Sequence, residues 1–174
     1  MNIAEHIRVI PDFPQPGVMF RDITSLLLNP AAFSQACDEM IAQIQPWKPE
    51  AIAAAEARGF VFGAVIAEKL GLPFILLRKP GKLPGKTVSY QYGLEYGTSE
   101  LHVHAGDVPA AARVVIIDDL VAVGGTAQAC CKLIEKAGGV PVGCSFVIEL
   151  LDLGGRKKLE PIPIVSLVQL HENE

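Results

Sequence analysis

Apolar residues along this chain alternate between two patterns, one typical of buried strands and one typical of amphipathic helices. Short, mostly apolar runs indicate strands covered on both faces; they occupy residues 51–55, 74–77, 114–117, 142–150 and 164–168. Apolar residues at helical spacing predict helices at 2–10, 30–44, 60–70 and 126–137. Strands that alternate with helices predict an α/β fold, in which a mostly parallel sheet is flanked by helices on both sides.

The residues at the ends of these segments support the helix assignments. Asn29 is a suitable N-cap and Pro30 a suitable first helical residue. Gly71 and the glycine pair 138–139 are placed to end two helices, because glycine readily adopts the left-handed conformation found there. Pro11 is expected to end the first helix. The core-facing stripe of the helix at 30–44 is expected to be Phe33, Cys37, Met40, Ile41 and Ile44.

Length and composition fit a single globular domain that spans residues 1–174. The chain is 50% hydrophobic and 20% charged, and its net charge of −4 comes without the basic clusters of a nucleic-acid-binding protein. The N-terminus has no apolar signal segment, and no uncharged apolar run reaches membrane-spanning length. The spacing of the cysteines fits reduced core thiols and not a metal site. We therefore expect a cytoplasmic protein that binds neither nucleic acid nor membrane.

Two long segments interrupt the alternation of strands and helices. Residues 11–28 are rich in proline, and residues 78–100 are rich in glycine, lysine and tyrosine. Connections of this length inside a compact domain are usually functional.

The segment VVIIDDLVAVGGT places polar chemistry directly after a buried strand. Asp118 and Asp119 follow the run 114–117, and ligands of open α/β sheets bind beyond the carboxyl ends of strands. Residues 122–126 then lead into a helix N-terminus, where backbone N–H groups and the helix dipole favour phosphate. The segment matches neither the Walker A loop nor the dinucleotide fingerprint. A tight turn capped by Asp119 would explain the glycines alone. The whole combination favours a ribose 5-phosphate, with its phosphate in the loop and its hydroxyls on the carboxylates.

This segment resembles the 5-phosphoribosyl 1-pyrophosphate (PRPP) motif of type I phosphoribosyltransferases. The resemblance implies that Asp118 and Asp119 hold the ribose hydroxyls and that the 5′-phosphate is bound by Ala122, Val123, Gly124, Gly125 and Thr126. It also implies the type I phosphoribosyltransferase fold, with a small N-terminal hood over residues 11–28 and a flexible β-ribbon lid over residues 78–104.

One residue of the loop departs from the family pattern. The family usually has threonine or serine where this chain has Val123. A hydrogen bond to a charged group contributes roughly 1.5–3 kcal/mol, so the missing hydroxyl predicts PRPP binding weaker by about tenfold or more.

The segment EARGFVFG repeats the order of strand, turn and helix. Arg58 beside the flexible Gly59 is placed to meet an anion at a second strand end; a surface arginine after a turn is the alternative. The segment, with Glu56 and Phe60, resembles the acid-x-Arg-Gly-Phe segment of adenine phosphoribosyltransferases. The resemblance implies that Arg58 and Gly59 contact pyrophosphate and that Arg58 acts in catalysis.

The lid segment is cationic as well as rich in glycine, and its cations are Arg78, Lys79, Lys82 and Lys86. A flexible cationic loop suits a lid that excludes water from a bound polyanion; a solvated β-ribbon is the alternative. The segment resembles the RKPGKLPG and LEYG signatures of adenine phosphoribosyltransferases. The resemblance implies a catalytic role for Glu95, in placing pyrophosphate or in relaying a proton of the base. It also implies pyrophosphate contacts from Arg78, Lys79, Lys82 and Tyr96. The alternating aromatics of SYQYGLEYG indicate a two-stranded arm.

The segment DFPQPGVMFRDIT resembles the base-binding segment of the same family. There, backbone groups read the edge of adenine and a phenylalanine stacks on the ring. The resemblance implies adenine contacts from Val18, Met19, Phe20 and Arg21, and a further match at 147–159 adds Leu150. Core packing is the alternative for Phe20.

These matching segments together imply one reaction, the conversion of adenine and PRPP to AMP and pyrophosphate. Mg²⁺ would be bound mainly through phosphates and water, because it prefers oxygen ligands, and no protein metal site is expected. The resemblance also implies a homodimer, in which Arg78 and its neighbours could come from the partner. Two alternatives remain: a phosphoribosyltransferase for xanthine or hypoxanthine, and a regulator that senses PRPP without turnover. The segments PGVMFRDIT and LEYG favour adenine, and a regulator would normally carry a DNA-binding segment or a basic face.

Overall fold

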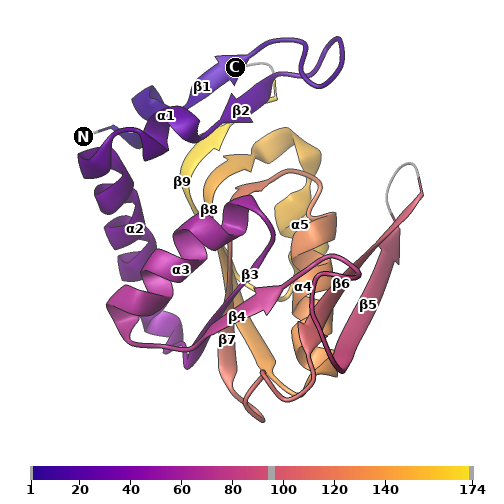
Figure 1. The fold of residues 1–174 in the computed structure, drawn as a ribbon. Helices are drawn as coiled ribbons and strands as arrows, with labels where there is room; N and C mark the ends of the chain where they lie inside the picture. The colour runs from indigo at the N-terminus through magenta and orange to yellow at the C-terminus, as the bar shows by residue number, and fades with distance from the viewer. Residues whose placement is uncertain (1, 94–96, 173–174) are drawn as a thin grey trace.

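The computed structural model describes residues 2–93 and 97–172 (Figure 1). Its centre is a sheet of five parallel strands in the order β4-β3-β7-β8-β9. The strands are β3 (Ala51–Ala55), β4 (Phe74–Leu77), β7 (Arg113–Val121), β8 (Val140–Leu150) and β9 (Ile164–Leu170). The five apolar runs of the sequence form these five strands, and the predicted α/β fold is confirmed.

Helices cover both faces of the parallel sheet (Figure 1). On one face lie α2 (Pro30–Ile44) and α3 (Arg58–Leu70), and on the other lie α4 (Gly125–Lys136) and α5 (Gly155–Leu159). Neighbouring side chains of β7 lie on opposite faces of the sheet: Ile116 belongs to the core under α4, and Ile117 belongs to the core under α2 and α3. Side chains alternate along a strand. A strand buried on both sides is therefore apolar at each position, as at 114–117.

The ends of the long helices follow the local sequence signals. The Asn29 side chain accepts a hydrogen bond of 3.1 Å from the N–H of Ala32, and Gly71 ends α3 with a φ of 65°. The expected core-facing stripe of α2 is buried at Cys37, Met40 and Ile44 and half-buried at Phe33 and Ile41. The helix predicted at 60–70 begins earlier, at Arg58.

The helix predicted at 2–10 is wrong. Only Ile3–His6 form a helical turn, the 3₁₀ turn η1, and Arg8–Ile10 form β1. β1 pairs antiparallel with β2 (Phe20–Asp22), so Arg8 lies opposite Asp22 and Ile10 opposite Phe20. This pairing satisfies backbone groups that a continued helix would otherwise bond internally, and it overrides the helical spacing of the isoleucines.

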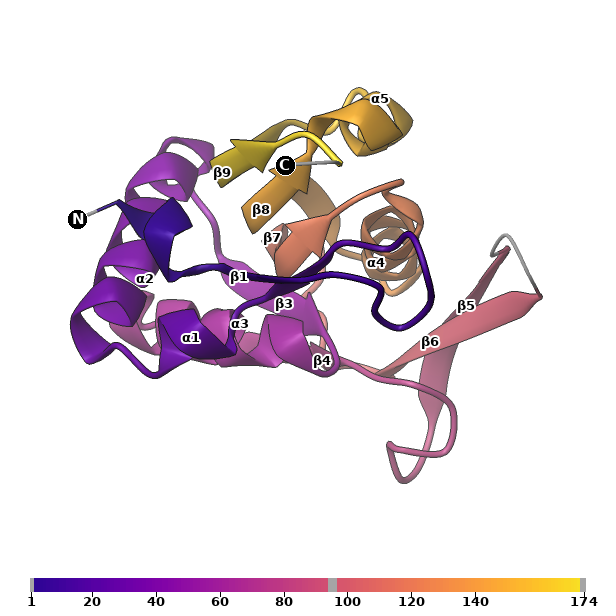
Figure 2. The same cartoon turned by 90° about the horizontal axis from the view of Figure 1, so that it is seen from above.

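The β1–β2 pair passes over the carboxyl ends of the parallel strands (Figure 2). The short helix α1 (Thr24–Leu27) follows β2 and leads to α2. The predicted hood segment 11–28 therefore contains the turn between β1 and β2, then β2 and α1.

The segment after β4 forms an arm that projects from the domain (Figure 1). It consists of β5 (Thr87–Gly93) and β6 (Thr98–His104), paired antiparallel, as the alternating aromatics predicted. Tyr90 and Tyr92 pack against the core, and the Lys136 ammonium of α4 donates to the Ser89 carbonyl at 2.8 Å. The base of the arm is therefore tied to α4.

Two further 3₁₀ turns are η2 (Gln45–Trp47) and η3 (Leu151–Leu153). All four cysteines are buried, as expected for core thiols. Across residues 2–93 and 97–172, the helices are too short or too polar to cross a membrane.

Candidate active site

The two adjacent acids lie in β7 itself, beyond the point where its neighbour β3 ends. The pairing of β7 with β3 stops at Ile117, whereas the pairing with β8 continues to Val121. The expectation that the strand ends at 117 is therefore corrected, because β7 continues to Val121 and β8 pairs with it at Asp118, Leu120 and Val121. Without β3 beside them, Asp118 and Asp119 line an open cleft.

The carboxylates of this pair have different surroundings. Asp119 is buried, and its Oδ2 lies 3.0 Å from Nε of Arg58. Asp118 Oδ1 accepts the N–H of Asp119 at 2.8 Å. Burial raises the pKa of Asp118 well above its usual range, the negative charge of Asp119 raises it further, and Arg58 opposes the shift. Asp119 is therefore paired with a guanidinium, whereas Asp118 resists ionisation.

Arg58 reaches Asp119 because α3 begins directly at the end of β3. Arg58 and Gly59 lie in the first helical turn and not in the flexible turn expected from the sequence. A Cβ on Gly59 would lie 3.0 Å from Asp118 Oδ1 and 3.0 Å from the Ile117 carbonyl oxygen. Glycine at this position therefore lets the start of α3 approach the acids closely.

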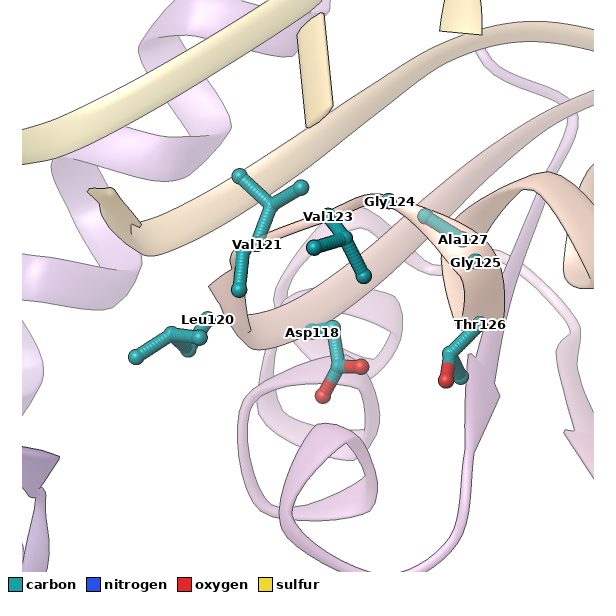
Figure 3. Close-up of a pocket in the computed structure, with 9 residues that line it drawn as sticks. Asp118, Leu120, Val121, Val123, Gly124, Gly125, Thr126 and Ala127 are labelled. Atoms are coloured by element: carbon teal, nitrogen blue, oxygen red, sulfur yellow. The ribbon is translucent and has the colours of Figure 1, made fainter. Parts of the chain in front are cut away.

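The loop after β7 forms a second hollow next to the acids (Figure 3). Its volume is about 200 Å³, and it is lined by Asp118 and residues 120–127. Gly124 adopts the left-handed conformation, with a φ of 83°, and α4 then begins at Gly125 without a side-chain cap. The first N–H groups of a helix have no partner within the helix, so this loop offers donors and a positive helix end to an anion. Val123 is 58% exposed at the hollow.

The end of β3 supplies the opposite wall of the cleft, whose volume is about 350 Å³. Glu56 accepts hydrogen bonds from the backbone N–H of Lys79 at 2.7 Å and from Arg78 Nε at 3.2 Å. Burial disfavours the charged form of Glu56, but these two partners outweigh it and lower the pKa. Lys79 and Arg58 thus line one cleft with both aspartates.

The hood meets this cleft through Phe20. The Arg58 guanidinium carbon lies 5.3 Å from the centre of the Phe20 ring, close enough for a cation–π contact. The Phe13 ring packs edge-on against Phe20 at 5.0 Å. Arg58 therefore contacts both an aromatic ring of the hood and a carboxylate at the sheet.

Residues 24–167 match the model of the phosphoribosyl transferase domain family. The adenine phosphoribosyltransferase of Desulforamulus reducens is 50% identical over 98% of this chain and 99% of its own length. This chain belongs to the adenine phosphoribosyltransferase family. A further member, from Maridesulfovibrio salexigens, is 49% identical over 98% of this chain and 100% of its own length.

Solved structures of the adenine phosphoribosyltransferase family share this fold. The enzyme from Thermoanaerobacter pseudethanolicus superposes with a TM-score of 0.94 at 48% identity, over 97% of this chain and 98% of that one. The Saccharomyces cerevisiae enzyme was crystallised with adenine and an imino-altritol bisphosphate. It superposes with a TM-score of 0.90 at 34% identity, over 95% and 96% of the two chains. The predicted type I phosphoribosyltransferase fold is confirmed.

The residues predicted from family resemblance are only partly brought together. Asp118, Asp119, Arg58, Lys79 and the loop 122–126 line the adjoining hollows. By contrast, Arg78 is directed to Glu56, and Lys82 is exposed in the loop before β5. Glu95 and Tyr96 lie outside the described residues.

In the segment expected to bind the base, groups of Val18 and Arg21 are used in contacts within the protein. The N–H and carbonyl of Val18 are used within the hood turn, by Gln15 and Phe13. The Arg21 side chain is buried and donates through Nη2 to the carbonyls of His171 and Glu172 at 3.2 and 3.0 Å. Arg21 thus ties the hood to the C-terminal segment, and its guanidinium is not directed at the acids.

Sequence reasoning missed one buried charged cluster near the phosphate loop. Glu149, opposite Val121 in the sheet, is held by Arg156 through two contacts, Nε–Oε1 at 2.9 Å and Nη2–Oε2 at 2.6 Å. Ser166 donates to the same carboxylate at 2.7 Å. A glutamate inside the otherwise apolar end of VGCSFVIEL was the available signal, since a buried charge requires a partner.

Proposed function

We propose that this chain transfers the 5-phosphoribosyl group of PRPP to adenine, forming AMP and pyrophosphate in purine salvage. The observation that carries the proposal is that the acid pair and Arg58 line one hollow and the phosphate loop lines an adjoining one, with Asp118 in both. Its presence in a chain half identical to an adenine phosphoribosyltransferase over nearly the full length supports adenine as the base.

The phosphate loop and the acids would position the two ends of the ribose. The 5′-phosphate would accept hydrogen bonds from the N–H groups at 122–126, and the carboxylates of Asp118 and Asp119 would accept hydrogen bonds from the ribose hydroxyls. Arg58 contacts Asp119, and a bound ribose would take the place of Arg58 there and leave the guanidinium to face pyrophosphate.

The chemical step exchanges one bond at ribose C1. The C1–O bond to pyrophosphate breaks, its electron pair leaves with pyrophosphate, and a nitrogen of adenine bonds to C1 while the base loses a proton. Positive charge develops on the sugar and negative charge on the leaving group. Carboxylates beside the sugar and cations such as Arg58 and Lys79 beside pyrophosphate match that charge separation, and preorganised electrostatics of this kind is commonly the largest catalytic contribution.

Mg²⁺ is proposed as the cofactor, carried mainly by the phosphates of PRPP. Among the described residues, no cluster of three or more His, Cys, Asp or Glu side chains could hold a metal ion. The Asp118 carboxylate at the open cleft fits a metal that retains substrate and water oxygens as ligands. When bound, Mg²⁺ would neutralise charge on the leaving pyrophosphate.

The remaining family roles stay proposals for this chain. Phe20 and Leu150 would flank adenine, with backbone groups of Val18, Met19 and Arg21 near its edge. The arm and the loop at 78–104 would close over PRPP as a lid. Arg78, Lys82 and Tyr96 would then contact pyrophosphate, and Glu95 would place pyrophosphate or relay the proton of the base.

A homodimer in the cytoplasm is proposed for the assembly and location. The dimer rests on the family resemblance, and the cytoplasm is supported by four buried cysteines that remain free thiols. Light scattering at assay concentration tests the dimer, and a mass near 18.6 kDa, that of one chain, would contradict it.

The direct test is the release of pyrophosphate by purified protein with PRPP, Mg²⁺ and a panel of purines. We expect adenine to be turned over and hypoxanthine and xanthine to be poor substrates. Turnover of xanthine but not adenine would reassign the base. Binding of PRPP without turnover of any base would favour a regulator.

Replacing Val123 with threonine is expected to lower the KM for PRPP by about tenfold, since a hydroxyl donor to phosphate contributes roughly 1.5–3 kcal/mol. Val123 is 58% exposed, so the substitution should not disturb the core. The KM for adenine should not change. Val123→Ala, which adds no hydroxyl, is the control, and an unchanged or higher KM for PRPP in the threonine variant would contradict the expectation.

A further inference from the structure

Helix α5 is in direct backbone contact with the phosphate loop. A Cβ on Gly155 would lie 2.5 Å from the carbonyl oxygen of Ala122, and a Cβ on Gly124 would lie 3.0 Å from the Gly155 Cα. A Cβ atom essentially never lies as close as 2.5 Å to another heavy atom, and it rarely lies as close as 3.0 Å. Glycines on both sides therefore allow α5 to pack against the loop with no side chain between them.

Helix α5 is also fixed in place by polar contacts. Arg156 is paired through two nitrogens with the buried Glu149, and its Nη1 donates to the Ile164 carbonyl at 2.9 Å. From the other side, Gln128 of α4 donates to the Lys158 carbonyl at 3.3 Å. The start of the Lys158 side chain thus has a defined position relative to the loop.

The Lys158 ammonium lies at the N-terminal end of α4. Its Nζ is 4.0 Å from the position that a Cβ on Gly125 would occupy. Within residues 2–93 and 97–172, no acidic side chain forms an ion pair with Lys158. A helix N-terminus carries positive potential, so an ammonium beside it adds to the attraction that the loop exerts on an anion such as phosphate.

We propose that Lys158 is a substrate-binding residue that contacts the 5′-phosphate of PRPP. This assignment rests on the proposed function for the identity of the ligand. The ammonium approaches the start of α4 from α5 and would add positive charge to a loop that has no hydroxyl at Val123.

The test compares Lys158→Ala with Lys157→Ala, a matched change of one charge at the preceding residue of the same helix. Calorimetry measures the Kd of ribose 5-phosphate, which occupies the loop, and of pyrophosphate, which does not. Lys158→Ala should raise the Kd of ribose 5-phosphate about tenfold, as expected for a charge-assisted hydrogen bond. It should leave the Kd of pyrophosphate unchanged, and Lys157→Ala should change neither. Lys158→Arg should retain most of the binding.

Steady-state kinetics of the same variants gives a second test. Lys158→Ala should raise the KM for PRPP and leave the KM for adenine and the kcat nearly unchanged. In a Val123→Thr background its effect should be smaller, because the threonine hydroxyl supplies part of the missing contact.

Three results would overturn the proposal. They are an unchanged ribose 5-phosphate Kd in Lys158→Ala, an equal loss in both alanine variants, and failure of the unaltered protein to bind ribose 5-phosphate. Failure of the proposed function gives a different result, namely ribose 5-phosphate binding that depends on Lys158 without adenine-dependent release of pyrophosphate. Because Lys158 is exposed, the melting temperature of the ligand-free variants should match that of the unaltered protein.

Discussion

Replacing Asp118 with asparagine is expected to stabilise the ligand-free protein and to lower kcat/KM for PRPP about 100-fold, near the upper end for one charge-assisted hydrogen bond. The carboxylate is costly in the empty site because burial and the charge of Asp119 both raise its pKa. Asparagine removes the charge, and its oxygen can still accept the N–H of Asp119. The charge is needed only when the ribose and its developing positive charge are present.

The pH dependence separates this explanation from a simple packing change. With a raised pKa, folded Asp118 holds a proton that the unfolded chain releases near the usual value of 3.8. The stability of the unaltered protein therefore falls as pH rises from that value to the raised pKa, and the asparagine variant lacks this loss. Urea titrations should show a stability difference that grows with pH. Asp107→Asn, at an exposed acid, is the control. An Asp118→Asn variant that is less stable than the unaltered protein at pH 7 would contradict the expectation.

The sheet could be predicted from the sequence because its central strands, such as β3 and the first part of β7, are buried on both faces and are therefore apolar at successive positions. The same rule placed the end of β7 too early. The strand predicted from the apolar run ends at the first acid, whereas the observed strand continues as long as β8 provides backbone partners, up to Val121 opposite Glu149. The prediction of the first helix failed for a related reason, since Arg8–Ile10 pair with Phe20–Asp22, and this pairing cannot be inferred from the sequence of residues 2–10 alone.

In the active site, the residue types could be predicted but the contacts between them could not. The acids and the glycine loop are adjacent in sequence, so their chemistry is visible as a motif. Arg58, by contrast, connects β7 to Phe20 of the hood, and three separate segments must be folded before that contact exists. The ion pair of Glu149 and Arg156 could likewise not be predicted, because it forms only when β9 and α5 lie beside the end of β8.

Replacing Arg156 with methionine is expected to destabilise the protein by about 2 kcal/mol. Breaking a fully buried ion pair costs roughly 3–5 kcal/mol, because the remaining charge is buried without a partner. The Glu149 side chain is 4% exposed, but that of Arg156 is 47% exposed, so water partly replaces the guanidinium and the loss should be smaller. Urea unfolding measures it, and Lys157→Met, which breaks no ion pair, is the control.

The double variant Glu149→Gln with Arg156→Met distinguishes a stranded charge from lost packing. The amide keeps a hydrogen bond for Ser166 and carries no charge, so the double variant should recover much of the stability lost in Arg156→Met. If the loss came from packing of the arginine side chain, the double variant would be no more stable than the single one.

The dependence of stability on acid pH provides a second check. Although burial opposes it, hydrogen bonds from Arg156 and Ser166 lower the pKa of Glu149 below its usual 4.5. The stabilisation by Arg156 is therefore present above that value and is lost as pH falls through the lowered pKa, so the difference between the unaltered protein and Arg156→Met should shrink in acid.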